Sequence, residues 1–391
     1  MRSIILHGRG TRMKLLVVSH PCVTPVNQQF FAEVESLSGW ELTIIVPSNW
    51  RSEYGRVNSV VRWPEFRGRL IGIPVYNSGN IPLHAYRTLW TSLLKRELPD
   101  VIYVHHESYA LATAQVYLAN RLSLKRPIGF YSAQNILKRY PPPIEQIQRT
   151  VLRRSSFALP VSSDAEEVLR KKGYQGVSTI LPLGIDPNVY NPRQDGQQLR
   201  QRLRGSAEEV IIGYVGYIIE EKGLATLLRA LSKLKDLHWS LVVVGTGPYA
   251  TSFERLARQL GLSQQVRQLG YVPHTDVPLY LSAFDLLVLP SETRGGLKEQ
   301  FGRVIIEALA CGTPVIGSNS GEIPRLLQAT GGGLIFPEGK AEALARQIRR
   351  LVEDPALRRE SATKGQARVL TEYTNRSLAD RFVLAIEGVA A

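Results

Sequence analysis

Residues 286–317 read LLVLPSETRGGLKEQFGRVIIEALACGTPVIG. The stretch opens on one short apolar run, Leu286–Leu289, and closes on another, Pro314–Gly317, with a loop and a helix-like segment, Arg303–Ala310, between them. Short apolar strands separated by a helix are typical of a βαβ unit in a parallel sheet. Because ligands of such sheets bind at the carboxyl ends of the strands, we expect a binding site at the loop that follows Leu289.

The same alternation of strands and helices continues in both directions. In the second half of the chain, further strands are predicted at Ile211–Val215, Leu241–Gly245, Val266–Leu269 and Gly333–Phe336. In the first half, strands are predicted at Leu15–Ser19, Leu42–Val46, Val101–Val104, Ile128–Tyr131 and Phe157–Val161. The pattern predicts an α/β fold of two Rossmann-like, doubly wound parallel-sheet domains that face a cleft.

A proline-rich segment marks the boundary between the two halves. Residues 181–192, LPLGIDPNVYNP, are poor material for helices and strands, and a polar stretch follows. We therefore divide the chain into a disordered N-terminal extension, an acceptor-binding domain, a linker, a nucleotide-sugar-binding domain and a C-terminal helix, over residues 1–12, 13–190, 191–209, 210–374 and 375–391. The binding roles of the two domains rest on the family resemblance described below.

The charge of the chain favours an anionic partner. Its 391 residues include 48 Lys and Arg against 34 Asp and Glu, which suits nucleic acid, phosphates or an acidic membrane surface. The two cysteines indicate no disulfide framework and no run is long enough to span a membrane, so we expect a cytoplasmic protein. The basic amphipathic segments Thr88–Glu97 and Arg149–Arg154 fit either ordinary helices or a peripheral contact with the inner face of the membrane.

A glycine-rich turn follows the strand that ends at Val215. Residues 213–223 read GYVGYIIEEKG, and a glycine such as Gly216 lets a ligand approach the backbone. Lys222 would add a positive charge where phosphates would lie, next to a helix N-terminus. The alternative is a tight turn with a surface lysine. The glycine spacing is not that of a dinucleotide-binding fingerprint.

Two acidic residues flank the start of the helix-like segment. Glu299 precedes it, Glu307 lies within it, and the amides of Phe301 and Gly302 could hold an anion. The alternative is an acid that stabilises the helix N-terminus together with an ordinary surface glutamate. Glu307, however, lies among isoleucines, leucine and alanines, where an acid is costly unless it is paired or used.

Together these motifs resemble the retaining, nucleotide-sugar-dependent glycosyltransferases of the GT-B fold, group 1 or family 4. The resemblance rests on the Glu-x7-Glu pair, the Ala-Cys-Gly-Thr-Pro run that follows it, the turn at residues 215–223 and the segment LPLGID at 181–186. It is strong over about residues 180–340. It implies transfer of a hexosyl group from a UDP- or GDP-linked sugar to a hydroxyl of a glycan or lipid-linked acceptor, as in polysaccharide biosynthesis, with no cofactor and no metal.

The resemblance also implies roles for individual residues. Glu299 would bind the donor sugar, Glu307 the ribose, and Lys222 the departing diphosphate, so that Glu299 and Lys222 are the catalytic candidates. Gly216 and the amides of Phe301 and Gly302 would lie against the phosphates. Relatives carry Arg or Lys where this chain has Tyr217. Lys298 in the donor site or Arg294 in the cleft lining would replace that cation, and Tyr217 itself is also expected to line the cleft.

The first half of the chain offers further candidates for the cleft. Relatives often place a histidine after the strand at Ile128–Tyr131, and this chain has Gln134 and Asn135 there. His106 also ends a strand on the cleft side. With His105 and Glu107 beside it, the segment could suggest metal ligands, but adjacent residues of an extended segment point to opposite faces, which favours cleft lining or a plain loop.

Two other functions remain open at the level of sequence. A nucleotide-sugar epimerase could use the same fold and donor site. A basic nucleic-acid-binding protein would explain the charge, but no binding motif supports it and we expect no nucleic-acid partner.

Overall fold

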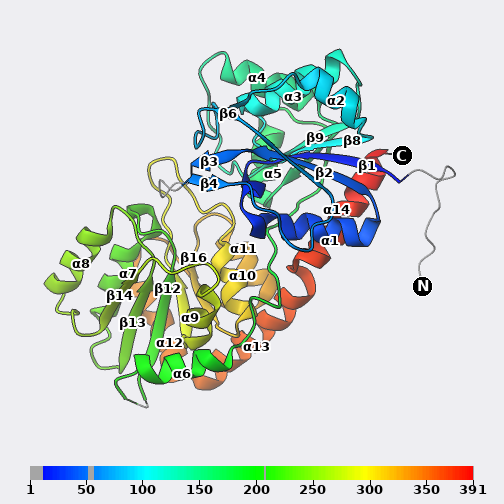
Figure 1. The fold of residues 1–391 in the computed structure, drawn as a ribbon. Coiled ribbons are helices and arrows are strands. Elements are labelled where there is room, and N and C mark those ends of the chain that lie inside the picture. Colours follow the sequence, from blue (N-terminus) through cyan, green and yellow to red (C-terminus); the bar gives the residue numbers. More distant parts are fainter. Residues whose placement is uncertain (1–11, 52–56, 207, 391) are drawn as a thin grey trace.

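The computed structural model describes residues 12–51, 57–206 and 208–390, and Figure 1 shows two α/β domains within them. The extension predicted over residues 1–12 lies outside this range except for Arg12. Among the described helices, none is both long enough and apolar enough to cross a bilayer.

The first domain is built on a parallel sheet in the order β11-β10-β9-β8-β1-β2-β5. Its strands are β1 Lys14–Val18, β2 Glu41–Pro47, β5 Arg69–Ile73, β8 Val101–Val104, β9 Ile128–Ser132, β10 Phe157–Pro160 and β11 Val177–Ser178. Two small antiparallel pairs lie beside it, β3 Asn49–Arg51 with β4 Val57–Ser59 and β6 Val75–Tyr76 with β7 Ala85–Tyr86. The strand order reverses between β1 and β8, which makes this the switch point where ligands of such sheets bind.

Helices cover both faces of this sheet. The helices α2 Trp90–Glu97, α3 Leu111–Leu122 and α4 Ile144–Arg154 share one hydrophobic core with the sheet. On the opposite face the core is closed by α1 Gln29–Ser38 and α14 Asn375–Ala390, which pack against each other. The C-terminal helix therefore belongs to the first domain. The helix α5 Ser163–Lys171 follows β10, and its N-cap Ser162 accepts a hydrogen bond from the amide of Ala165.

The second domain repeats this plan with the strand order β14-β13-β12-β15-β16-β17. Its strands are β12 Val210–Val215, β13 Trp239–Val244, β14 Val266–Gly270, β15 Leu286–Leu289, β16 Val315–Ser318 and β17 Gly333–Phe336. All pairings are parallel, and the order reverses between β12 and β15. Side chains alternate between two cores, so that Leu287 and Leu289 face one side while Leu286 and Val288 face the other.

The helices of the second domain lie on both faces of its sheet. They are α6 Gln194–Leu203, α7 Leu224–Leu231, α8 Ala250–Gln259, α9 Val277–Ala283, α10 Arg303–Ala310, α11 Ile323–Thr330, α12 Ala341–Glu353 and α13 Pro355–Glu372. One core receives side chains from α9, α10 and α11, and the other from α7, α8 and α12. The two sheets and their helix layers confirm the predicted fold.

The structure differs from the prediction at residues 191–209, where we expected a linker. Most of this segment forms α6, which packs against α9. Arg200 and Arg204 of α6 bind the carboxylate of Asp285, which is 4% exposed and also accepts a hydrogen bond from the amide of Ile211 at 2.9 Å. Because these arginines satisfy a buried acid, a polar helix is held on the second domain.

Two chain crossings join the domains, and they run side by side. Residue Ile185 of the first crossing forms a parallel bridge with Thr374 of the second. The amide of Ile185 donates to the carbonyl of Tyr373 at 2.9 Å, and that of Asn375 donates to Ile185 at 2.8 Å.

Candidate active site

A cavity of about 540 Å³ lies between the two domains, over the switch point of the second sheet. Val215 and Gly216, at the end of β12, line it together with Leu289 and Ser291, at and just after the end of β15. Asn135, which follows β9, contributes from the first domain. The cavity therefore lies at the carboxyl edge of the parallel strands, where the topology places a ligand.

Lys222 and Glu299 meet in this cavity. The Nζ of Lys222, in the 3-10 turn Glu220–Lys222, lies 2.7 Å from Oε2 of Glu299. The hydroxyl of Ser291 donates to the same oxygen at 2.9 Å. Both charged side chains are largely shielded, with 27% of the lysine and 11% of the glutamate exposed. The expectation that the turn after β12 and the loop before α10 come together is confirmed.

The other predicted donor-site residues differ in whether they line the cavity. Gly216, Lys298 and Gly302 line the cavity. Gly302 is the N-cap of α10 with a φ of +80°, a backbone conformation that favours glycine. The side chain of Phe301 is buried in the hydrophobic core at 4% exposure, and the predicted contact of its backbone amide with a phosphate stays a prediction. The helix spans Arg303–Ala310, the range that the sequence suggested.

Glu307 lies beneath the cavity, one turn into α10. It is 6% exposed and is not among the described residues that line the cavity. Its Oε1 is 3.1 Å from Nε of Arg303, one helical turn away. The buried acid is thus paired, as its apolar surroundings require. Its predicted contact with the ribose stays a prediction.

The two cations expected to replace the one missing at Tyr217 are engaged elsewhere. Lys298 forms an ion pair with Asp164 of the first domain. Arg294 lies 2.7 Å from Glu220 and 2.6 Å from Glu292 and is not among the described lining residues. These two acids hold the side chain of Arg294, and its predicted place in the cleft lining stays a prediction.

Arg303 is a cation of the cavity wall that the sequence analysis did not select. It lines the donor cavity at the start of α10, with 34% of its side chain exposed. The positive end of the helix dipole lies at the same place. The available signal was a basic residue directly after Gly302, in the first turn of the helix.

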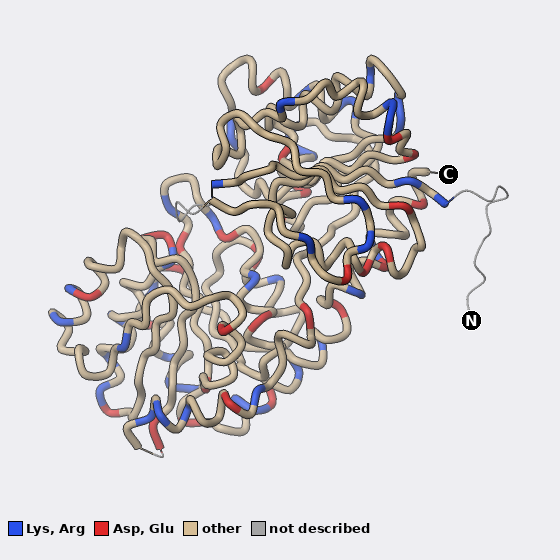
Figure 2. Tube along the Cα trace, in the orientation of Figure 1, with Lys and Arg blue, Asp and Glu red and all other residues tan. Residues whose placement is uncertain are grey.

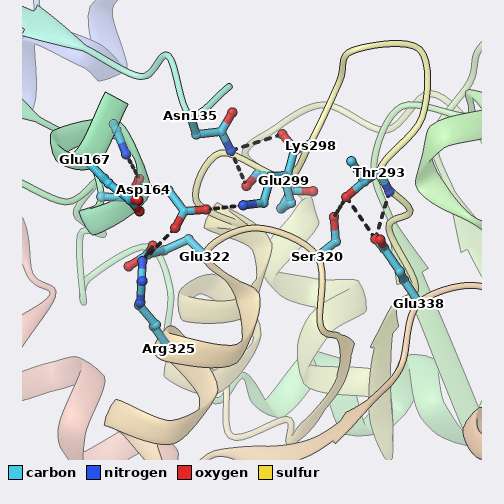
Figure 3. A network of polar contacts seen from close by, with 12 residues as sticks. Asn135, Asp164, Glu167, Thr293, Lys298, Glu299, Ser320, Glu322, Arg325 and Glu338 are labelled. Carbon is cyan, nitrogen blue, oxygen red and sulfur yellow. Dashed lines mark hydrogen bonds and ion pairs between the residues drawn. The ribbon is translucent and has the colours of Figure 1, made fainter. Parts of the chain in front are cut away.

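A polar network crosses the cleft beside the cavity, as Figure 3 shows. Asp164 of α5 binds both Lys298 and Arg325 of the second domain, the latter at 2.8 Å. Burial alone would raise the pKa of Asp164, but the two cations outweigh it and hold the pKa below its ordinary value. The side-chain amide of Asn135 donates to the backbone carbonyl of Glu299 at 2.8 Å. The first domain therefore holds the loop that carries Glu299.

A second cavity of about 360 Å³ opens beside the first, mainly within the first domain. Tyr109, Gln300 and Arg303 line both, so that the two cavities are adjoining parts of one cleft. The predicted lining residues divide between them: Tyr217, Gln134 and Asn135 line the donor cavity and His106 the second.

Glu107 lines the second cavity, and its carboxylate is hydrogen-bonded by neighbouring residues of the first domain. It accepts hydrogen bonds from the hydroxyl of Ser132 and the amide of Ala133. Burial raises the pKa of Glu107 to about 7, against the lowering effect of these bonds, so part of the population is neutral near pH 7.

Comparison with known proteins shows what the chain is similar to. Residues 195–368 match the family described as glycosyl transferases group 1. The chain is 26% identical over 336 residues to 2-deoxystreptamine glucosyltransferase of Streptomyces kanamyceticus, covering 81% of this chain and 85% of the relative. It is 28% identical over 230 residues to a GDP-mannose-dependent phosphatidylinositol monomannoside mannosyltransferase of Mycolicibacterium smegmatis, covering 56% and 59%.

The fold has close counterparts among solved structures. One is Anabaena HepE, solved in complex with UDP, with a TM-score of 0.75 at 18% identity over 96% of this chain and all of that one. Family match, relatives and two-domain architecture agree: the chain has the GT-B fold, resembles the group 1 glycosyltransferases over residues 195–368, and transfers a sugar from a nucleotide-sugar donor.

Proposed function

We propose that the donor diphosphate binds between Lys222 and the start of α10, with the sugar against Glu299. One observation carries this proposal: the two residues meet in an interdomain cavity at the β12/β15 switch point. In the absence of donor, the lysine is neutralised by Glu299 at 2.7 Å. A diphosphate that displaces this contact would leave the carboxylate available for sugar hydroxyls.

Arg303 is proposed as the second cation that binds the phosphates. It would replace the basic residue that relatives carry at the position of Tyr217. Its position on the wall shared by both cavities would set the guanidinium beside the bond that breaks. Guanidinium groups recognise phosphate through two parallel hydrogen bonds. With Lys222 and the helix dipole, this arrangement would stabilise the developing charge without a metal ion at the diphosphate.

The proposed transfer retains the configuration of the anomeric carbon. The acceptor oxygen bonds to that carbon on the face from which the diphosphate leaves, and the hydroxyl proton passes to the departing phosphate oxygen. Such a reaction needs no protein nucleophile. The adjoining second cavity would hold the acceptor on that face.

Donor and acceptor classes are proposed from the relatives and neighbours. The mycobacterial relative is named for GDP-mannose and a phosphatidylinositol acceptor, and HepE was solved with UDP. We propose a UDP- or GDP-linked sugar as donor and a hydroxyl of a glycan or lipid-linked acceptor. A thermal-shift screen against UDP, GDP and ADP sugars identifies the donor.

The test compares Lys222→Ala with Lys233→Ala, whose lysine forms a similar ion pair on the surface with Glu342 at 3.1 Å. Loss of a group that stabilises transition-state charge costs about 100-fold or more in kcat. We expect that loss for Lys222→Ala, measured as nucleoside diphosphate release, and rates within twofold of wild type for Lys233→Ala. Equal rates in the two variants would refute the assignment.

Two further measurements address the type of reaction. Proton NMR of the product should show the anomeric configuration of the donor, and an inverted product would contradict the mechanism. Incubation with donor alone should leave the sugar unepimerised, since conversion without acceptor would indicate an epimerase.

A peripheral membrane contact is also proposed, but on a different helix from those the sequence suggested. The apolar residues of α2 and α4, such as Leu94 and Val151, are buried in the core. On α3, which packs between these helices, Leu111, Leu118 and Leu122 are 37%, 57% and 68% exposed. Spacings of seven and four place these leucines on one face of the helix.

Basic side chains flank this leucine face. Exposed Arg121 lies on α3, Lys95 and Arg96 on α2, and Arg153 and Arg154 on α4. Elsewhere Figure 2 shows Lys and Arg distributed over both domains among Asp and Glu. Exposed leucines beside basic residues suit an anionic bilayer surface.

Liposome flotation with and without anionic lipid tests the contact. We expect binding to anionic vesicles, and loss of that binding in Leu118→Ser/Leu122→Ser. The matched control is Leu384→Ser on α14, a leucine 61% exposed and distant from the leucine face in the sequence. Equal flotation of control and double variant would argue against α3 as the contact.

A further inference from the structure

Three histidines converge in the first domain, at the switch point of its sheet. His20 follows β1, His106 follows β8, and His84 comes from the loop before β7. One nitrogen from each ring lies within 4.8 Å of the others. The ring centroids are 4.8 to 5.6 Å apart. The strand order of the first sheet brings His20 and His106 together, and the loop before β7 adds His84.

His84 presents a nitrogen lone pair that no described residue satisfies. Its Nδ1 lies 2.9 Å from the carbonyl of Ile81 and 3.2 Å from that of Asn80. Carbonyls only accept, so Nδ1 carries the proton and Nε2 holds the lone pair. Nε2 is buried without a hydrogen-bond partner in the described structure, on a residue that is 0% exposed. A buried polar atom left in this state is costly, and a bound ligand would remove the cost.

A backbone carbonyl on the second nitrogen is also how proteins orient a histidine that binds metal. His106 has a comparable outer contact, since its Nε2 is 3.4 Å from the hydroxyl of Tyr86. Its Nδ1 is 2.7 Å from Nδ1 of His20, so two ring nitrogens already face each other. Each ring therefore offers one nitrogen toward the shared centre and, in two of the three, a second nitrogen held by a protein oxygen.

The three rings are enclosed by the protein: His84 is 0% and His106 1% exposed, and His20 is partly exposed. The rings of Trp50 and Tyr86 pack against the cluster and limit its contact with water.

We propose that His20, His84 and His106 bind one divalent transition-metal ion of the zinc class. Three neutral histidines are a recognised set for such an ion, which keeps a fourth position for an oxygen ligand. Bonds of about 2.0–2.1 Å place tetrahedral ligands about 3.3 Å apart. The nitrogens of His20 and His106 would therefore move apart by roughly half an ångström, and that of His84 would move inward.

The ligand for the fourth position comes from the adjoining cavity. His20 and His106 line the second cavity, so its contents have access to the ion. We assign this position to an acceptor oxygen, which is the one part of the inference that rests on the proposed function. The ion would lie in the acceptor half, apart from the residues that neutralise the donor diphosphate.

Co²⁺ titration of chelator-treated, full-length protein tests the site. We expect one equivalent to bind with the visible absorption of tetrahedral Co²⁺, and Zn²⁺ to displace it. His84→Ala and His106→Ala should weaken binding at least 100-fold, while His238→Ala, an exposed histidine of the second domain, should not change it. Absence of stoichiometric binding by wild type, or unchanged binding by His84→Ala, would overturn the proposal.

Two controls keep the result interpretable. If the buried variants do not fold, as judged by circular dichroism, the partly exposed His20→Ala carries the test, and unchanged affinity in it would overturn the site. Thermal shift with UDP and GDP is measured on the same samples. Nucleotide binding without Co²⁺ binding would reject the metal site alone, and the reverse would reject the donor site alone.

Discussion

Gly321 is the residue through which the position of Glu299 can be tested without touching its side chain. Gly321 has a φ of +56°, and a Cβ built on it would lie 1.8 Å from the carbonyl oxygen of Glu299 and 2.8 Å from its carbonyl carbon. Real Cβ contacts are essentially never below 3.0 Å, so Gly321→Ala must move this backbone by about 1 Å. The same carbonyl accepts the hydrogen bond from Asn135, which would also be disturbed.

A displacement of about 1 Å at a catalytic group can cost on the order of 100-fold in rate. We therefore expect Gly321→Ala to lower kcat/KM about 100-fold. Alanine in the left-handed region also costs about 1–2 kcal/mol of stability, and this effect must be separated from the displacement.

Gly339→Ala is the matched control. Gly339 has a φ of +71° and no atom within 4 Å of its built Cβ, so alanine there carries the backbone cost alone. Both variants should lower the thermal midpoint, but only Gly321→Ala should lose activity in steady-state assays of nucleoside diphosphate release. A kcat/KM within threefold of the control would refute the claim that the backbone position of Glu299 limits the reaction.

Three more predictions concern the cleft and the core. Asp164→Asn removes the carboxylate that pairs with Lys298 and Arg325 across the cleft, a partly exposed interaction worth about 1 kcal/mol. The KM for the donor should therefore rise about fivefold in steady-state kinetics. An unchanged KM would show that these ion pairs do not favour closure of the two domains. Arg303→Met should weaken the binding of nucleoside diphosphate about 10- to 100-fold, since hydrogen bonds to charged groups contribute about 1.5–3 kcal/mol. Isothermal titration calorimetry measures this affinity. An affinity equal to that of wild type would exclude Arg303 from the phosphate site. Burial raises the pKa of Cys311 to about 12, so iodoacetamide at pH 8 should label it only after unfolding; peptide mass spectrometry showing rapid native labelling would contradict this.

Much of the fold could be predicted because its central strands are short apolar runs. Val101–Val104, Leu286–Leu289 and Gly333–Phe336 have the bounds that the sequence suggested. Elements with mixed patterns were missed. β5, Arg69–Ile73, is an edge strand that includes an arginine and a glycine, and α6 is a largely polar helix whose arginines bind a buried aspartate while Leu199 and Leu203 pack against the core.

Some features of the candidate site could likewise be predicted from the sequence, and others could not. The meeting of Lys222 with Glu299 follows from two motifs at neighbouring strand ends, which topology brings together. The engagement of Lys298 by Asp164 could not be predicted, because it depends on how the two domains close. The convergence of His20 with His84 likewise depends on an irregular loop, whose path no periodic pattern encodes.

The return of α14 to the first domain makes that domain discontinuous in the sequence. Leu378, Phe382 and Ile386 of α14 are fully buried in its core. A gene fragment ending near residue 190 would therefore encode a domain with an open apolar groove. Removal of α14 would destabilise the first domain, although this helix is the last element of the chain. Since both crossings are hydrogen-bonded to each other at Ile185, the two domains are joined by a paired, two-stranded connection and not by a single chain.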